Sequence, residues 1–209
     1  FVIDASHDSE DIQQFREIFV KRLIAYVHAL RCHLRNEDPT EAIKQFLPPE
    51  DLTKVLASGH RPLAILHQLG HDLASARDRH WLHELNFPSM DAQLNELSNI
   101  LGGCERIKNT PIPFSYSVLI HRIVASYCLF LPFGLVETTG VLTPIVVLLI
   151  SYAFFELDAI GDEIENPFGL QPNDLPLTAI SRNVEINLLE LINYPDRPAA
   201  LKPENDILM

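Results

Sequence analysis

The pattern of apolar and polar residues differs between the two halves of this chain. Between residues 9 and 35 the apolar positions recur every three or four residues, which predicts one long amphipathic helix. Shorter helices follow, and prolines and glycines mark their boundaries at Pro48, Pro49, Gly59, Pro62 and Pro88. The helix near Pro88 is expected to end at Ile100, before Gly102 and Gly103. No alternating pattern is long enough to predict a strand.

The second half contains two long apolar stretches. The only acidic or basic side chains in residues 115–136 are His121 and Arg122. As a helix this stretch would span about 33 Å, close to the thickness of a bilayer core. A tight turn is expected at 137–140, and residues 141–157 then form a second apolar run. By length alone the second run also fits a buried core helix. Together the two runs predict a membrane hairpin.

Basic residues predict the orientation of this hairpin. Arg106 and Lys108 precede the first apolar run, whereas the turn between the runs has no lysine or arginine. The positive-inside tendency therefore places the turn outside and most of the chain in the cytoplasm. The segment after the second run is acidic, but acidic residues contribute little to this tendency.

Composition narrows the classes of function. The 209 residues include 16 Lys and Arg against 28 Asp and Glu, a net charge of -12, so no nucleic-acid partner is expected. Cys32, Cys104 and Cys128 stand far apart, which is typical of free thiols in a reducing compartment. The first 15 residues contain no basic region followed by an apolar one, so they are not expected to be a secretory signal.

The sequence contains no convincing catalytic or metal motif. His67 and His71 are spaced as two ligands on one helix face, with Asp72, His80 and His83 nearby, but the glutamate of a metalloprotease motif is absent. A structural role for these histidines is the main interpretation, and a metal-dependent enzyme the competing one. Phosphate-binding loops and nucleophile motifs are also absent, so the chain is not expected to be an enzyme or to hold a metal or cofactor.

Charged groups near the apolar runs have two interpretations. The acidic residues after the second run either form a solvated helix end or a negative collar that concentrates cations near a conduction path: Glu156, Asp158, Asp162, Glu163 and Glu165. Arg122 lies about two turns into the first run. Because a charge is costly inside a bilayer, Arg122 is expected to reach the interface or an interhelical partner.

Two motifs carry a family likeness. The sequence CERIKNTPIP at 104–113 precedes the apolar hairpin, and NPFGLQPNDLPL at 166–177 follows it, before ISRNVEINLLELI at 180–192. In this order and spacing they resemble the bestrophin family in its bacterial branch. The resemblance implies an all-α, multi-pass membrane protein with a large cytoplasmic helical domain, which assembles into a homopentameric channel with four transmembrane helices per subunit.

The resemblance also implies a division of the chain. The first two membrane helices of the family, including the pore neck, precede the region that matches residues 11–35, so an N-terminal truncation is expected and the neck residues lie upstream. The expected parts are a cytoplasmic helical region, a transmembrane hairpin, a cytoplasmic turn with a terminal helix and a Pro-rich tail, at residues 1–112, 113–160, 161–194 and 195–209.

Candidate site residues follow from the same resemblance. One apolar side chain per subunit forms a ring at the cytoplasmic exit of the family's pore, and the candidates here are Leu85, Phe87 and Met90. Asn166 and Asp174 match positions of a calcium clasp in animal members. Because most of the clasp's carboxylates are missing, no high-affinity Ca²⁺ site is expected, and Asp174 is predicted mainly to cap the last helix.

The leading functional hypothesis is a channel subunit that conducts small monovalent ions, either chloride-type anions or monovalent cations, across the bacterial inner membrane. Its expected partners are other copies of the chain, the lipid bilayer and the permeating ions. The alternative hypothesis is a membrane-anchored helical scaffold or regulatory protein that conducts nothing.

Overall fold

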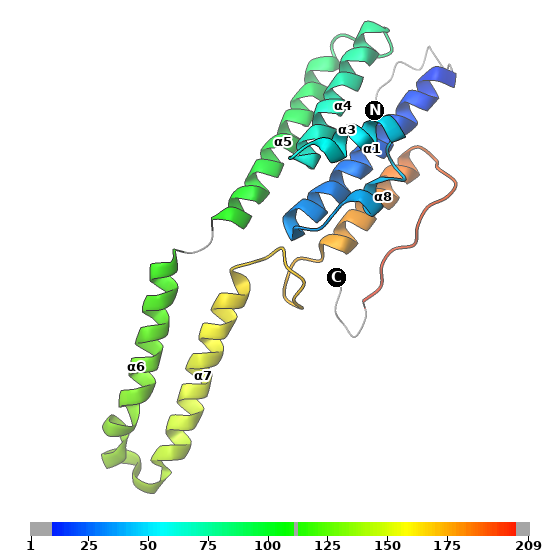
Figure 1. The fold of residues 1–209 in the computed structure, drawn as a ribbon. Coiled ribbons are helices and arrows are strands. Elements are labelled where there is room, and N and C mark those ends of the chain that lie inside the picture. The colour runs from blue at the N-terminus through cyan, green and yellow to red at the C-terminus, as the bar shows by residue number, and fades with distance from the viewer. Residues whose placement is uncertain (1–9, 111–112, 204–209) are drawn as a thin grey trace. The chain divides into compact units, whose positions relative to one another are not determined.

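A computed structural model describes residues 10–110 and 113–203 of the chain, and Figure 1 shows its helices. No strand occurs within these described ranges, which confirms the all-α prediction. The chain divides into two compact units. Unit 1 comprises residues 1–106 and 176–209, and unit 2 comprises residues 107–175.

Unit 1 is a helical domain built around one long central helix. Its elements are α1 (Glu10–Arg35), α2 (Thr40–Ile43), α3 (Pro49–Ala57), α4 (Arg61–Asp78), most of α5 (Phe87–Asn109) and α8 (Leu177–Leu191). Helix α1 packs against both α4 and α8. Small residues such as Ala25 and Ala29 are completely buried on α1, which allows its neighbours to approach closely. The apolar stripe predicted from the sequence therefore forms the core.

Helix α5 continues beyond the predicted end at Ile100 and runs to Asn109. Gly102 and Gly103 lie inside it, so residues 104–109 are helical and not a turn. Leu101 is 3% exposed in the main core, and the Tyr26 hydroxyl donates a hydrogen bond to the Leu97 carbonyl at 2.9 Å. These tertiary contacts outweigh the helix penalty of about 1 kcal/mol per glycine.

Asp174 does not cap the last helix as predicted, and Thr40 does not cap its helix either. The residue before α2 is Pro39, and the Thr40 hydroxyl donates instead to the Asp38 carboxylate at 3.1 Å. Helix α8 begins after Pro176, while Asp174 accepts the backbone N–H of Gln171 at 2.7 Å. Asp174 therefore stabilises the turn before α8, because its side chain is already engaged three residues upstream.

Unit 2 contains the predicted hairpin, formed by α6 (Phe114–Thr139), the 3₁₀ turn η1 (Gly140–Leu142) and α7 (Thr143–Ile164). The predicted turn at 137–140 is helical up to Thr139, and Gly140 adopts a φ of +53° that suits a residue without Cβ. The Thr139 and Thr143 hydroxyls hydrogen-bond each other at 2.8 Å across the turn.

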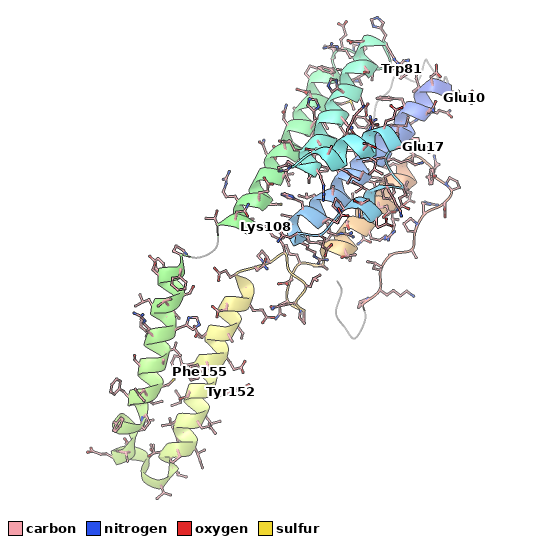
Figure 2. The ribbon with its side chains drawn as sticks, viewed as in Figure 1. Glu10, Glu17, Trp81, Lys108, Tyr152 and Phe155 are labelled. Carbon is pink, nitrogen blue, oxygen red and sulfur yellow. The ribbon has the colours of Figure 1, made fainter. Side chains whose placement is uncertain are left out.

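The hairpin has the length and apolarity of a membrane-crossing segment. The stretch Phe114–Ile164 is long enough and apolar enough to cross a membrane, and only 6% of its most apolar 18 residues are buried. Figure 2 shows its side chains along α6 and α7, with Tyr152 and Phe155 labelled, and these two are 64% and 51% exposed. A soluble protein would bury such surfaces, so the hairpin is suited to a lipid environment.

The first nine and last six residues, together with Pro111 and Ile112, lie outside the described ranges. Expectations for those positions stay predictions. Residues 195–203 of the Pro-rich tail contain no helix.

A buried polar pair joins α1 to α8 and has a pH-dependent consequence. His28 Nε2 lies 3.0 Å from Glu185 Oε2, and the imidazole stacks on Phe46 at 5.6 Å between ring centroids. Burial lowers the pKa of His28 below its ordinary value of 6.5, and Arg31 and Arg182 act in the same direction, although Glu185 opposes them. The folded state therefore favours the neutral imidazole.

We expect stability to fall on mild acidification because of this histidine. The unfolded chain binds a proton at His28 near pH 6.5 while the folded chain resists it, so this stabilisation is present above that pH and lost below it. Between pH 7 and 5.5, the unfolding free energy of His28→Gln should fall less than that of the wild type, as measured by denaturant titration. His67→Gln, at an exposed histidine, is the control. Equal losses in wild type and His28→Gln would contradict the prediction.

Candidate functional site

The three candidates for the cytoplasmic aperture occupy different environments. Leu85 is 80% exposed in the loop between α4 and α5. Phe87 and Met90 instead pack against a small core of Leu73, Ala76 and Leu82. The Arg77 guanidinium also lies over the Phe87 ring, at 4.8 Å from its centroid. Of the three candidates, only Leu85 presents an apolar side chain that the unit itself does not cover.

The loop that carries Leu85 is held by its own hydrogen bonds. The backbone N–H of Leu85 donates to His83 Nδ1 at 3.2 Å, and the N–H of Asn86 donates to the His83 carbonyl at 2.9 Å. Leu82, three residues earlier, is only 5% exposed and anchors the loop in the core. The exposed Leu85 side chain therefore lies on a hydrogen-bonded turn.

The five acidic collar candidates do not point in one direction. Asp158 and Asp162, one turn apart on α7, both face His121 of α6, whose Nε2 lies 3.3 Å and 3.4 Å from their Oδ2 atoms. They line a groove of about 280 Å³ between the two helices, which Glu165 also borders. Glu163 accepts a hydrogen bond from Asn173 at 3.1 Å. Glu156 is exposed on α7.

Arg122, the next residue on α6, is exposed. No ion pair to it is found within residues 10–110 and 113–203. The expectation that it reaches the membrane interface or a partner helix stays a prediction.

The clasp candidates meet at a glycine. A Cβ placed on Gly169 would lie 2.5 Å from Asp174 Oδ2 and 3.4 Å from Asn166 Nδ2, so a side chain here would displace the Asp174 carboxylate. The Leu175 N–H closes the turn on the Pro167 carbonyl at 2.9 Å. One carboxylate, already accepting a backbone N–H, is a poor ligand set for a hard cation.

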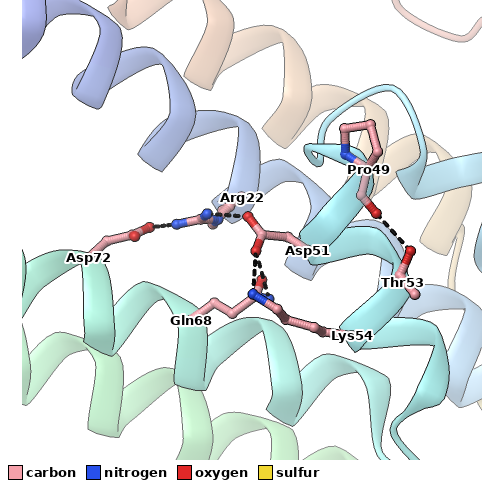
Figure 3. A network of polar contacts seen from close by, with 7 residues as sticks. All are labelled: Arg22, Pro49, Asp51, Thr53, Lys54, Gln68 and Asp72. Atoms are coloured by element: carbon pink, nitrogen blue, oxygen red, sulfur yellow. Dashed lines mark hydrogen bonds and ion pairs between the residues drawn. The ribbon is translucent and has the colours of Figure 1, made fainter.

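His67 and His71 lie side by side on α4, with ring centroids 4.8 Å apart. They border a hollow whose floor holds a charged network around Arg22, shown in Figure 3. Arg22 of α1 donates to Asp72 of α4 and to Asp51 of α3, and its side chain is only 10% exposed.

Further polar groups complete the Arg22 network. Gln68 donates to Asp51 at 3.4 Å, and Lys54 lies 3.7 Å from the same carboxylate (Figure 3). Burial raises the pKa of Asp72 and outweighs the opposing effect of Arg22. The network joins α1, α3 and α4 through Arg22, Asp51 and Asp72.

Sequence reasoning missed a second cluster. Glu105 Oε1 of α5 lies 2.7 Å from His33 Nε2 of α1 and 2.7 Å from His60 Nε2, which precedes α4. These histidines are 72 and 45 residues from Glu105 along the chain, so no local motif links them. Burial raises the pKa of Glu105, but the two imidazole hydrogen bonds outweigh it and lower the pKa overall.

Comparisons with known proteins agree with the sequence motifs. Residues 2–190 match the family described as Bacterial/Fungal Bestrophin protein. The chain is 43% identical to the voltage-dependent anion channel-forming protein YneE of Salmonella typhi over 188 residues, which cover 90% of this chain and 62% of that protein. YneE of Escherichia coli K12 is 41% identical over 197 residues, 94% of this chain and 64% of that one.

Solved structures are similar as well. A bacterial bestrophin homologue from Klebsiella pneumoniae superposes with a TM-score of 0.83 at 37% identity, over 88% of this chain and 68% of that one. A structure described as a membrane protein gives 0.84 at 36% identity, over 89% and 68%. The chain thus spans less than two thirds of the length of its curated relatives. Both its sequence and its fold show that the chain belongs to the bacterial and fungal bestrophin family.

Proposed function

We propose that the chain forms most of one subunit of a channel for small anions in the bacterial inner membrane. The observation that carries the proposal is the identity of 43% to a protein named as voltage-dependent anion channel-forming. The exposed apolar hairpin supports a membrane location, because its side chains need lipid or other helices to cover them. A homopentamer, with unit 1 in the cytoplasm, is the assembly that we propose.

Leu85 is the residue that we propose for the cytoplasmic aperture. Its 80% exposure leaves the side chain free to meet its copies around a pore axis, whereas Phe87 and Met90 are engaged in the core of unit 1. A ring of leucines would narrow the pore and oppose its hydration, which is how apolar constrictions gate ion flow. A loop held by hydrogen bonds at His83 can keep such a ring in place.

Anions are preferred over cations in this proposal because the acidic collar is partly satisfied within the hairpin. Asp158 and Asp162 face His121, and Glu163 is hydrogen-bonded to Asn173. Carboxylates engaged in this way offer a weaker attraction to passing cations than a free ring would. Cation conduction and the non-conducting scaffold are the alternative outcomes of the flux experiment.

Chloride flux from liposomes tests both the channel and its aperture. We expect the full-length protein to release chloride down a gradient, and Leu85→Ala to raise the rate several-fold because a smaller side chain widens the constriction and is less apolar. Met90→Ala is the matched control, since Met90 packs in the core and should lower thermal stability without raising flux.

The outcomes separate the hypotheses. Absence of anion and cation flux under every gradient would support the scaffold and contradict the channel. Selective release of potassium instead of chloride would favour cations. Chloride flux that Leu85→Ala leaves unchanged would keep the channel but remove Leu85 from its aperture.

A further inference from the structure

We propose that His33, His60 and Glu105 form a binding site for one divalent transition-metal ion of the zinc class. The three side chains come from the end of α1, the residue before α4 and the last part of α5. Two imidazole nitrogens and one carboxylate oxygen are ligands that Zn²⁺ accepts, and a fourth position remains for water.

The ligand atoms are already grouped. His33 Nε2, His60 Nε2 and a Glu105 carboxylate oxygen all lie within 4.8 Å of one another. Among the described residues, this is the only group of three or more His, Cys, Asp or Glu side chains whose ligand atoms lie this close together. The His33 and His60 rings lie 4.8 Å apart at an interplanar angle of 34°, and the Nε2 atoms of both rings face the same Glu105 oxygen.

Only a small opening would admit the ion. Ligand atoms about 2.1 Å from a tetrahedral zinc are about 3.4 Å apart. Each 2.7 Å contact between histidine and Glu105 would have to lengthen by about 0.7 Å, and the two Nε2 atoms, which lie within 4.8 Å of each other, would have to reach the same separation. The side chains are 31%, 34% and 26% exposed, which leaves room for this shift and for a water ligand. A fully buried cluster would allow neither.

Metal binding would change the tautomer of both imidazoles. A carboxylate accepts hydrogen bonds but does not donate them, so a neutral imidazole in this contact carries its proton on Nε2 and donates a hydrogen bond from Nε2–H to Glu105. To bind the ion through Nε2, each ring must hold its proton on Nδ1 instead. His60 Nδ1 now accepts the Leu63 N–H at 3.3 Å, and this bond at the start of α4 would be lost.

The proposed ion would join three helices of unit 1. Without it, the cluster is a hydrogen-bonded contact among α1, α4 and α5. With it, the contact becomes a coordination site, and ligand binding to the folded state alone raises stability by mass action. The site is independent of the proposed aperture at Leu85, because neither uses the other's residues.

Zinc titration of the full-length protein, after treatment with a chelator, tests the site. We expect one Zn²⁺ per chain by calorimetry, a higher thermal midpoint with ZnCl₂, and the visible spectrum of tetrahedral Co²⁺ when cobalt replaces zinc. Glu105→Gln keeps a hydrogen-bond acceptor for both histidines but replaces a charged ligand with a neutral one, and should abolish stoichiometric zinc binding.

Two controls make the result decisive. The double variant His67→Gln/His71→Gln removes the exposed histidine pair of α4 and should leave zinc affinity unchanged. The thermal midpoint of Glu105→Gln in chelator shows whether the variant is folded, so a folding defect is separated from lost binding. Absence of stoichiometric zinc binding in the wild type would overturn the proposal. So would binding that survives Glu105→Gln or disappears with His67 and His71.

Discussion

Replacing Arg22 with methionine is expected to lower the unfolding free energy by about 3–5 kcal/mol. Methionine fills a similar volume, but it leaves Asp51 and Asp72 without their shared guanidinium, and their side chains are only 15% and 20% exposed. Two carboxylates would then repel each other in a poorly solvated site. Denaturant unfolding of wild type and Arg22→Met measures the loss.

Lys54→Met is the matched control for this variant. Lys54 faces the same carboxylate of Asp51, at 3.7 Å, but is 70% exposed, so its removal should cost less than about 1 kcal/mol. Similar costs for both variants would show that burial does not decide the effect. A loss below about 1 kcal/mol in Arg22→Met would contradict the prediction directly.

The pH dependence of Arg22→Met provides a second check. Burial already raises the pKa of Asp72, and Asp51 raises it further, while Arg22 opposes both. Without Arg22 the folded state should bind a proton at Asp72 more readily than the unfolded chain does. Stability linked to a raised carboxyl pKa is lost as pH rises, so the difference from wild type should narrow as pH falls from 7 toward 4.

Placing an arginine at Leu148 is expected to disfavour membrane insertion of the hairpin by about 100-fold. Leu148 is 69% exposed on α7 and lies near the middle of the predicted span 141–157. A charge at that depth costs about 2.5–3.5 kcal/mol on insertion scales. The fraction of full-length protein that resists alkaline extraction from membranes measures the effect.

Leu63→Arg is the control for Leu148→Arg. Leu63 is also an exposed leucine on a helix, at 46%, but it belongs to α4 of unit 1. The same substitution there should change membrane association little and stability by less than about 0.5 kcal/mol. Equal extraction of both variants, or full retention of Leu148→Arg, would argue against a membrane position for α7.

The sequence predicted most of the fold because its strongest signals are local. The apolar period of residues 9–35 became α1, and the two apolar runs became α6 and α7. These signals depend on helical spacing and on span length, both of which can be read without knowing any distant contact. The motifs at 104–113 and 166–177 likewise indicated the family that the comparisons show.

Local signals failed where distant residues decide the structure. Gly102 and Gly103 predicted a helix end, yet α5 continues because Leu101 and Leu97 contact the core and α1. Asp174 predicted a helix cap, yet it is engaged by the turn around Gly169. A tertiary contact in the first case, and a competing local turn in the second, outweighed a preference of about 1 kcal/mol.

The sequence by itself determined the helical class, the apolar hairpin and the bestrophin motifs, because each depends only on residues that are close together in the chain. Only the tertiary structure separated exposed Leu85 from the packed Phe87 and Met90, and only it brought His33 and His60 to Glu105. Exposure and coordination depend on which distant surfaces pack together. Packing joins residues that are far apart in the chain, so helical spacing cannot report it.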